Sequence, residues 1–300
     1  MMRMYHKPVL LDACLEGLAL KESGTYVDVT FGGGGHTKAI LDAIGSGGKV
    51  IAFDQDEDAA ENSLDDDRLI FVHQNFSFLQ RFLRFHKIDK VDGILADLGV
   101  SSHQIDTPER GFSTRFDGPL DMRMNSSEGV SARDVVNTYT KEQLSDIFYQ
   151  YGELTNARKI ALRIVEQRSH KPIETTLELT ETLSPLVPVK IKHKVMAQIF
   201  QALRIEVNQE LEALKSLLEQ SGEVIKSNGR LCVISYHSLE DRLVKRFIQH
   251  GCFDSEPAKD EFGHSHKPFK KVGQLALPSE TEIKKNKRAR SAKLRIAEKI

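Results

Sequence analysis

Four consecutive glycines, Gly32 to Gly35, are the residues of this sequence best suited to holding a small ligand. They follow the β-branched run 26–31 directly and precede an apolar pattern of helical spacing at 39–44. Glycines between a strand and a helix N-terminus let the backbone approach a ligand where a Cβ would collide. The stretch therefore predicts a cradle for a nucleotide-type cofactor, and a glycine turn without a ligand is the alternative.

The spacing of these glycines separates two kinds of cofactor. The dinucleotide fingerprint G-x-G-x-x-G would need glycine at Thr37 or Lys38, so it fails in both registers. The looser nucleoside pattern acidic-x-G-x-G-x-G fits better, with Asp28 in first place and Thr30 instead of the first glycine. Such a loop need only pass close to an adenosine and its thioether or sulfonium arm. We therefore expect an adenosine cofactor without a pyrophosphate.

Two further residues end or follow short apolar runs and would border the same ligand. Asp54 comes after the run 49–53, where a carboxylate can accept hydrogen bonds from both ribose hydroxyls. A helix N-cap is the alternative for Asp54. Phe76 follows the run 68–73 and is placed to flank the adenine ring, although a core position suits it equally.

Polar residues crowd the end of the next apolar run, 91–97. They are Asp97, Ser101, Ser102 and Gln104. The C-terminal ends of strands line the ligand crevice of a doubly wound sheet, so we expect the transfer chemistry here. A fifth apolar run, 231–235, leads to His237 and Ser238, which would reach the edge of the same crevice.

The alternation of strands and helices predicts an α/β fold with a doubly wound, Rossmann-like sheet, interrupted once. We assign 1–104 to the first part of the core and 105–204 to an inserted helical substrate-recognition domain. Residues 205–300 form the second part of the core with a basic C-terminal tail. Capping boxes that begin at Thr140 and Thr175 start two helices of the insertion. The tail ends in an alternating pattern that suits an edge strand.

An aperiodic stretch at 110–124 is rich in Arg, Asp, Gly and Phe, as functional ordered loops are. Its candidate substrate-binding residues are Arg110, Phe112, Arg115, Phe116 and Arg123. The arginines would meet phosphates and the phenylalanines would stack on an extruded base. Internal pairing of the arginines with Asp117 and Asp121 is the alternative, and we expect it for at least one of them.

Bulk composition narrows the class of protein. The 300 residues carry a net charge of −1, but the segment 284–299 holds eight Lys or Arg against one Glu, which suits phosphate contacts. No apolar run is long enough for a membrane span, and we expect a cytoplasmic protein without membrane contact. Three cysteines without C-x-x-C spacing, and an isolated pair at His264 and His266, predict no metal site.

The sequence resembles the bacterial ribosomal RNA small subunit methyltransferase H family, also called MraW, over nearly its whole length. Five separated motifs carry the resemblance: T-F-G-G-G-G-H, D-L-G-V-S-S-x-Q, R-G-F-S-x-R-x-D-G-P-L-D-M-R-M, I-S-Y-H-S-L-E-D-R and N-K-R-A-R-S-A-K-L-R-I-A-E. It implies a class I methyltransferase fold and S-adenosylmethionine-dependent methylation of the N4 amine of a cytosine in the decoding region of 16S ribosomal RNA. The implied partner is that RNA within the small ribosomal subunit.

The resemblance also implies roles for individual residues. The implied cofactor-binding set is Gly34, Gly35, His36, Asp54, Phe76, Asp97 and Gln104. We expect Asp97 and Ser101 to be catalytic, as acceptors for the hydrogens of the target amine. Asp97 is followed by Leu-Gly-Val where many amino-methyltransferases have Pro-Pro-aromatic, so a role in cofactor binding alone is the alternative. His103 and Gly33 depart from the family pattern without adding or removing a chemical group.

Two other classes of protein share parts of these patterns. An NAD oxidoreductase would have the same core, and the failed dinucleotide spacing argues against it. A non-catalytic RNA-binding protein would keep the basic helices and tail but would need no glycine cradle. The sequence leaves open whether the chain acts on free RNA or on an assembled subunit, and whether it forms a homodimer.

Overall fold

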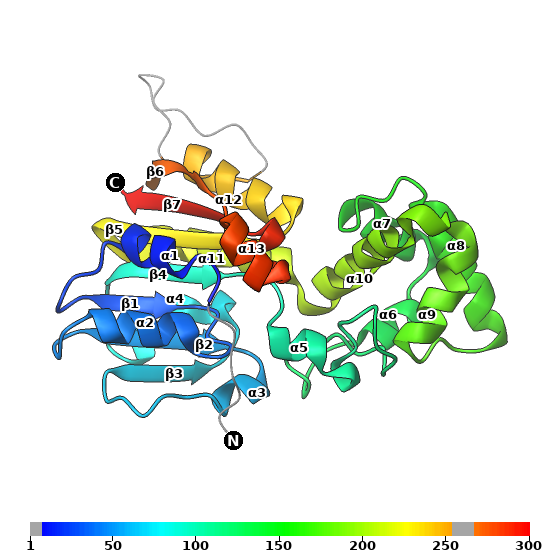
Figure 1. The fold of residues 1–300 in the computed structure, drawn as a ribbon, viewed down its shortest axis with the longest axis horizontal. Helices are drawn as coiled ribbons and strands as arrows, with labels where there is room; N and C mark the ends of the chain where they lie inside the picture. The colour runs from blue at the N-terminus through cyan, green and yellow to red at the C-terminus, as the bar shows by residue number, and fades with distance from the viewer. Residues whose placement is uncertain (1–7, 254–266) are drawn as a thin grey trace. The chain divides into compact units, whose positions relative to one another are not determined.

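The computed structural model describes residues 8–253 and 267–300, so that His264 and His266 lie outside the described residues. The chain forms two compact units: Met1–Gly99 with Leu211–Ile300, and Val100–Glu210 (Figure 1). The sequence placed these boundaries after residues 104 and 204. Among the described residues, no helix has the length and apolar character needed to cross a membrane.

The first unit is built on one seven-stranded sheet of order β3-β2-β1-β4-β5-β7-β6 (Figure 1). Its strands are β1 (Thr25–Asp28), β2 (Lys49–Asp54), β3 (Leu69–His73), β4 (Val91–Asp97), β5 (Ile225–Ser235), β6 (Phe269–Ala276) and β7 (Lys293–Lys299). The first five strands are parallel, and β7 runs antiparallel to both β5 and β6. This mixed sheet confirms the predicted class I methyltransferase fold.

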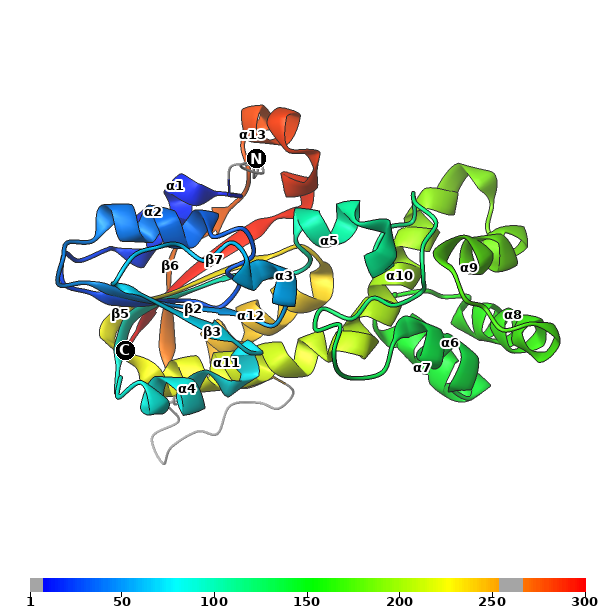
Figure 2. The same cartoon turned by 90° about the horizontal axis from the view of Figure 1, so that it is seen from below.

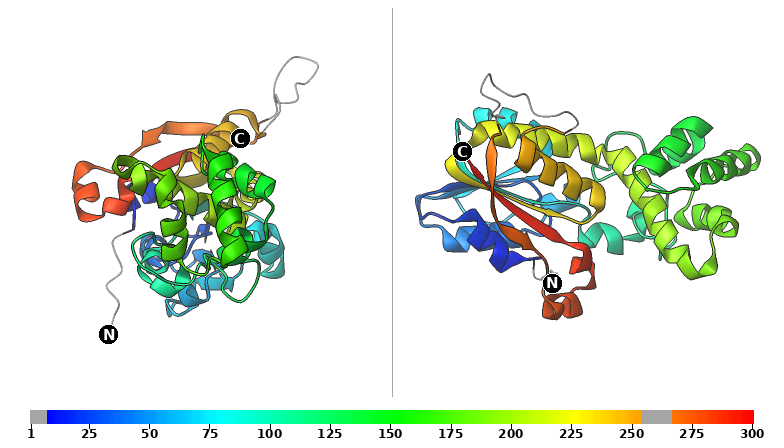
Figure 3. Two further views of the ribbon diagram at one scale, coloured as in Figure 1. Left: turned by 90° about the vertical axis from the view of Figure 1, so that its right-hand side faces the viewer. Right: turned by 90° about the horizontal axis from the view of Figure 1, so that it is seen from above.

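Helices cover both faces of the sheet (Figures 2 and 3). One face packs against α1 (Leu11–Leu18) and α2 (Gly35–Ala43), and the other against α4 (Leu79–Phe85), α11 (Glu210–Val224) and α12 (Ser238–His250). Shorter elements complete the unit: α3 (Glu57–Ala60), η1 (Phe76–Phe78), α13 (Glu280–Lys285) and η5 (Lys287–Ser291). Successive strand residues serve opposite cores, since Tyr26 packs with α1 and α2 and Val27 with α4 and α11.

The C-terminal part of the sheet differs from its prediction. The tail strand β7 is not an edge strand, because it lies between β5 and β6, and the polar segment before it supplies the edge strand β6. The tail charges are also partly neutralised. Asp241 accepts from Arg295 at 2.7 Å and pairs with Lys293 at 3.4 Å, and Glu298 pairs with Arg230 at 2.7 Å. Lys293 and Arg295 thus connect β7 to Asp241 of α12, and these two of the eight tail cations have partners within the chain.

The second unit is helical and has a hydrophobic core of its own (Figure 1). Its elements are α5 (Ser102–Asp106), η2 (Pro108–Arg110), α6 (Ala132–Thr138), α7 (Lys141–Gln150), α8 (Ala157–His170), α9 (Thr176–Leu183), η3 (Ser184–Leu186), η4 (Val189–Ile191) and α10 (Lys192–Asn208). Both predicted capping boxes are confirmed, from Thr140 to Gln143 and from Thr175 to Glu178.

Candidate active site

The glycine loop joins β1 to α2 and leaves room beside its backbone. Gly32 and Gly34 have φ values of 51° and 73°, in the left-handed region that favours glycine. The amide of Gly34 donates to the carbonyl of Phe31 at 2.8 Å, which closes a tight turn before α2 begins. A Cβ added at Gly32 would meet no atom within 4 Å. The loop therefore presents open space next to its backbone, as a cofactor cradle requires.

Asp28 fixes this loop from within. Its side chain is fully buried, and its carboxylate accepts from the Thr37 hydroxyl at 2.7 Å and from the Thr30 amide at 3.1 Å. The Thr30 hydroxyl accepts from the amide of Asp97 at 2.7 Å and so ties the loop to the end of β4. The acidic residue of the nucleoside pattern thus fixes the shape of the loop, and the candidates for ligand binding are other carboxylates.

Asp54, the last residue of β2, is the first of these candidates. Its Oδ2 accepts from the Gly32 amide at 2.7 Å and its Oδ1 from the Asp56 amide at 2.9 Å. Burial raises the pKa of this carboxyl to about 6, although both amide bonds act in the opposite direction. Each oxygen retains a lone pair for a ribose hydroxyl. The N-cap alternative is wrong, because Asp56 caps α3 by accepting from the Asp58 amide.

Asp97, at the end of β4, belongs to a polar cluster that the sequence did not predict in full. The Tyr236 hydroxyl donates to its Oδ1 at 2.8 Å, and Nδ1 of His36 lies 3.8 Å from its Oδ2. The Asp97 side chain keeps 22% of its surface exposed. Burial raises the pKa of this carboxyl to about 6, against the opposing effects of His36 and Tyr236. Tyr236 follows β5 directly and precedes the predicted His237 and Ser238, and this position is its signal in the sequence.

His36 and Phe76, both predicted to bind cofactor, have contacts within the chain. His36 is buried, and its Nε2 lies 3.1 Å from the carbonyl of Val9, so this ring connects the N-terminal segment to Asp97. Phe76 packs against the hydrophobic core but is only partly buried, so a core position and a contact with the adenine are both compatible with it. Nδ2 of the neighbouring Asn75 side chain donates to Oε1 of Gln55 at 2.7 Å and ties the ends of β2 and β3 together.

The polar groups at the strand ends of the first unit suit S-adenosylmethionine. Asp54 and Asp97 end the two strands that flank β1, whose own end carries the glycine loop. Carboxylates accept hydrogen bonds from ribose hydroxyls and attract the cationic ammonium and sulfonium groups of this cofactor. The open space beside Gly32 leaves the backbone accessible between them. Residues and cofactor are therefore chemically matched.

Ser101 and Gln104 belong to the second unit, where they form the capping box of α5. The Ser101 hydroxyl accepts from the Gln104 amide at 3.1 Å, and Oε1 of Gln104 accepts from the Ser101 amide at 2.9 Å. Gln104 is buried and Ser101 is partly exposed. Both side chains therefore stabilise the first turn of this helix, a role that neither prediction included.

Two residues predicted to bind substrate, Arg110 and Phe112, instead hold the loop 110–124 in its conformation. Arg110 donates to the carbonyls of Arg123 and Met124 at 3.1 and 2.9 Å, and its guanidinium lies 5.9 Å from the centre of the Phe112 ring. Phe112 is only 9% exposed and belongs to the core of the helical unit. Contrary to the prediction, Phe112 offers no face to an extruded base, because the loop folds its ring inward.

Of the remaining candidate residues in this loop, one is paired within the chain and two are exposed. Arg123 makes a salt bridge to Asp121 at 2.7 Å, as the pairing alternative predicted. Arg115 and Phe116 are exposed, Phe116 with 45% of its surface, and they remain the candidates for contact with substrate. The backbone here is held in place, since the carbonyl of Phe116 accepts from the Thr176 hydroxyl at 2.8 Å.

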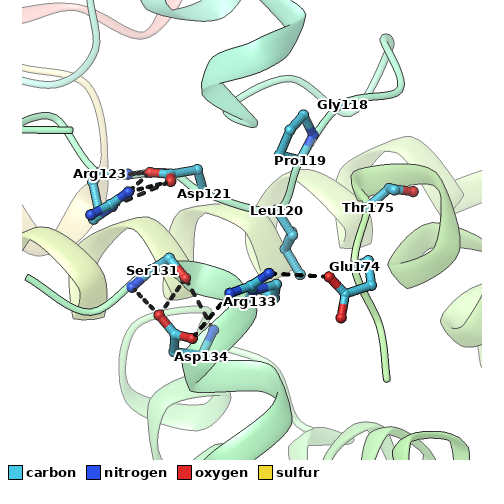
Figure 4. Close-up of a pocket in the computed structure, with 10 residues that line it drawn as sticks. All are labelled: Gly118, Pro119, Leu120, Asp121, Arg123, Ser131, Arg133, Asp134, Glu174 and Thr175. Atoms are coloured by element: carbon cyan, nitrogen blue, oxygen red, sulfur yellow. Dashed lines mark hydrogen bonds and ion pairs between the residues drawn. The ribbon is translucent and has the colours of Figure 1, made fainter. Parts of the chain in front are cut away.

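A pocket of about 650 Å³ lies beside this loop in the helical unit (Figure 4). Its lining residues are Gly118, Pro119, Leu120, Asp121, Arg123, Ser131, Arg133, Asp134, Glu174 and Thr175. Both guanidinium groups in it are paired, Arg123 with Asp121 and Arg133 with Glu174 at 3.2 Å. The charges of the pocket are thus balanced internally, and it does not present free cations to a phosphate.

Comparison with known proteins gives matches over the whole chain. The sequence model of the MraW methylase family matches residues 3–300. A protein of Flavobacterium johnsoniae called ribosomal RNA small subunit methyltransferase H is 59% identical over 296 residues, which cover 99% of this chain and 98% of that protein. Proteins with the same name from Christiangramia forsetii and Bacteroides fragilis are 56% and 54% identical, covering 99% and 98% of this chain and 98% and 97% of their own.

Proposed function

Because the chain belongs to the MraW methylase family, we propose that it transfers the methyl group of S-adenosylmethionine to the N4 amine of a cytosine in the decoding region of 16S ribosomal RNA. At the coarser level, the chain is a ribosomal RNA small subunit methyltransferase. The observation that carries the proposal is that the match spans the methyltransferase core and the helical unit alike. Cytosine N4 as the target is the finer part that needs experiment.

S-adenosylmethionine, when bound, supplies a sulfonium methyl for direct in-line transfer. The ends of β1, β2 and β4 would hold it. Asp54 would accept from the ribose hydroxyls with the lone pairs that its two amide bonds leave free. The backbone at Gly32 would border the adenosine, because a glycine has no side chain that would keep the ligand away from it. Phe76 would offer the exposed part of its ring to the adenine.

Asp97 would act on the amine. In the transfer, a nitrogen–carbon bond forms while the carbon–sulfur bond breaks, and the amine loses one proton. The lone pair of an N4 amine is conjugated with the ring, so an acceptor for its hydrogens favours the pyramidal nitrogen of the transition state. Asp97 is suited to this because Tyr236 occupies one of its oxygens and orients the carboxylate. A protonated Asp97 could not accept in the same way, which makes ionisation of this group a requirement.

The substrate would be the RNA within the small ribosomal subunit. The target base must leave its stack to reach a methyl group in a crevice. The exposed Arg115 and Phe116 of the helical unit would contact it, one through a phosphate and the other through a base. In this proposal the helical unit binds the RNA around the target base, and the sheet unit carries out the methyl transfer.

Transfer of labelled methyl from S-adenosylmethionine to purified small subunits lacking the modification tests the proposal directly. We expect incorporation that is lost in Asp54→Ala, and less incorporation into naked 16S ribosomal RNA. Calorimetry separates the alternatives, because tight NAD binding without S-adenosylmethionine binding would establish an oxidoreductase instead. Binding to the subunit without methyl transfer, under conditions in which the cofactor binds, would establish a non-catalytic RNA-binding protein.

A further inference from the structure

The outer side of α4 and of the turn η1 before it exposes aromatic and cationic side chains together. We call this surface the α4 face, and its residues are Phe78, Arg81, Arg84, Phe85 and Lys87. Phe85 exposes 76% of its surface and Phe78 46%, unusually high values for phenylalanine. Phe78, Arg81 and Phe85 are spaced i, i+3 and i+7, and Arg84 follows Arg81 by three, so that they share one side of the helix.

The chain holds α4 firmly, so these exposures do not result from a frayed helix. Leu79 and Leu83 are buried on its inner side, and Phe82 makes an edge-to-face contact with Phe53 at 6.1 Å between ring centres. Gln220 of α11 accepts from the amide of Gln80 at 2.8 Å and donates to the carbonyl of Ser77 at 2.7 Å. A rigid helix, drawn beside α11 in Figure 2, therefore carries the α4 face.

The charge on the α4 face is uncompensated. Between residues 74 and 88 the sequence contains no Asp or Glu. Within residues 8–253 and 267–300, no carboxylate pairs with Arg81, Arg84 or Lys87. Some other cations of the same unit have a carboxylate partner, as Arg68 has in Asp66 at 2.6 Å and Lys38 in Asp42 at 2.7 Å. The local sequence and the fold thus keep three cations free beside two exposed rings.

We propose that the α4 face is a second RNA-binding surface, which holds an unpaired segment of ribosomal RNA away from the target cytosine. This inference rests on the proposed function. Guanidinium and ammonium groups next to exposed aromatic rings form the combination that binds single-stranded RNA, with cations on phosphates and rings stacked on bases. An acidic protein partner would use the cations alone and would leave both rings without a purpose.

The spacing of the rings defines the kind of RNA segment. Phe78, at the end of η1, and Phe85, at the end of α4, are seven positions apart, which corresponds to about 10 Å along a helix axis. Bases in a continuous stack are about 3.4 Å apart. The two rings therefore suit bases that are not stacked neighbours, as in a bulge or loop, and Arg81 and Arg84 lie between and beside them to meet the connecting phosphates.

Kinetics on small subunits with the full-length chain test this proposal. We expect Phe85→Ala to raise the KM for subunits about tenfold, the effect of one lost base stack, with little change in kcat. The double variant Arg81→Ser/Arg84→Ser should lower the slope of log KM against log salt by about 1.4, which is about 0.7 for each lost phosphate contact to a single strand. Phe85→Tyr should restore the wild-type KM, because it keeps a stacking ring. Affinity for S-adenosylmethionine should stay unchanged in all of them.

Matched controls come from the same unit. Leu277→Ala removes a 60% exposed apolar side chain, and Lys271→Ser removes an exposed cation, and neither should change KM. If Phe85→Ala leaves KM at the wild-type value on subunits that the wild type methylates, this inference is overturned and the proposed function stands. If the wild-type chain methylates no small-subunit substrate, both are overturned. A wild-type dimer in sedimentation that Phe85→Ala converts to a monomer would assign the α4 face to a second copy and overturn the RNA site.

Discussion

Replacement of Tyr236 by Phe isolates the hydrogen bond that orients Asp97. The hydroxyl donates to Oδ1 at 2.8 Å, and the ring lies beside Gly99, where an added Cβ would be 3.5 Å from Cδ2. Phenylalanine keeps this ring contact and removes only the donor. Burial and the neighbouring carboxylates raise the pKa of Tyr236 well above its ordinary value, so the hydroxyl stays protonated throughout the working range.

The expected size follows from the bond that is lost. A donor to a carboxylate favours its ionised form, so its removal raises the pKa of Asp97. A hydrogen bond to a charged group is worth about 1.5–3 kcal/mol, and one pKa unit corresponds to about 1.4 kcal/mol. The Asp97 side chain is 22% exposed, so water compensates part of the loss. We expect a rise of about one unit, from about 6 to about 7.

Methyl transfer at saturating S-adenosylmethionine, measured between pH 5 and 9, reports this shift. The rate rises with pH as Asp97 ionises, so the acidic limb of the Tyr236→Phe profile should move upward by about one unit while its plateau changes little. Tyr149→Phe is the matched control, because Tyr149 is 66% exposed on α7. Superimposable wild-type and Tyr236→Phe profiles would refute the assigned role of Tyr236, and a rate lowered equally at every pH would leave orientation as its role without the effect on the pKa of Asp97.

Three further substitutions have expected outcomes. Asp54→Asn should weaken S-adenosylmethionine binding about 10–100-fold by calorimetry. The affinity of the wild type should rise with pH near 6 as Asp54 ionises, and the variant should lack this part of the rise. Equal affinities of the two proteins would contradict the ribose role. Gly111→Ala should lower the free energy of unfolding by about 2 kcal/mol or more in urea titration, because φ is 72° and the new Cβ would lie 2.3 Å from the Pro119 carbonyl oxygen. Thr140→Ala should cost about 1 kcal/mol in the same titration through loss of the capping bond to the Gln143 amide, and Thr140→Ser should retain it.

Local patterns predicted those parts of the structure that local physics determines. The ends of β2 and β4 carry Asp54 and Asp97 because a parallel strand must end where its apolar run ends. The capping boxes at Thr140 and Thr175 could be predicted because each lies within four consecutive residues, and both are present in the structure. The glycine run likewise indicated where α2 begins, because Gly32 and Gly34 before it have positive φ angles that glycine adopts without strain.

Features that depend on distant segments could not be predicted in this way. Tyr236 and Asp97 are 139 residues apart, and only the pairing of β5 with β4 brings them together. Phe112 looks like a surface aromatic in its polar loop, yet the helices that bury it begin twenty residues later, at α6 (Ala132–Thr138). β6 is polar because it is an edge strand, so its sequence resembles a loop.

The central claim is that this chain methylates the N4 amine of a cytosine in 16S ribosomal RNA. Mass spectrometry of that RNA from cells lacking the protein, complemented with the wild type or with Asp54→Ala, tests it most directly. We predict that N4-methylation of one decoding-region cytosine is absent in the deletion strain, restored by the wild type and not restored by Asp54→Ala. An unchanged N4-methylcytosine signal in the deletion strain would contradict the claim.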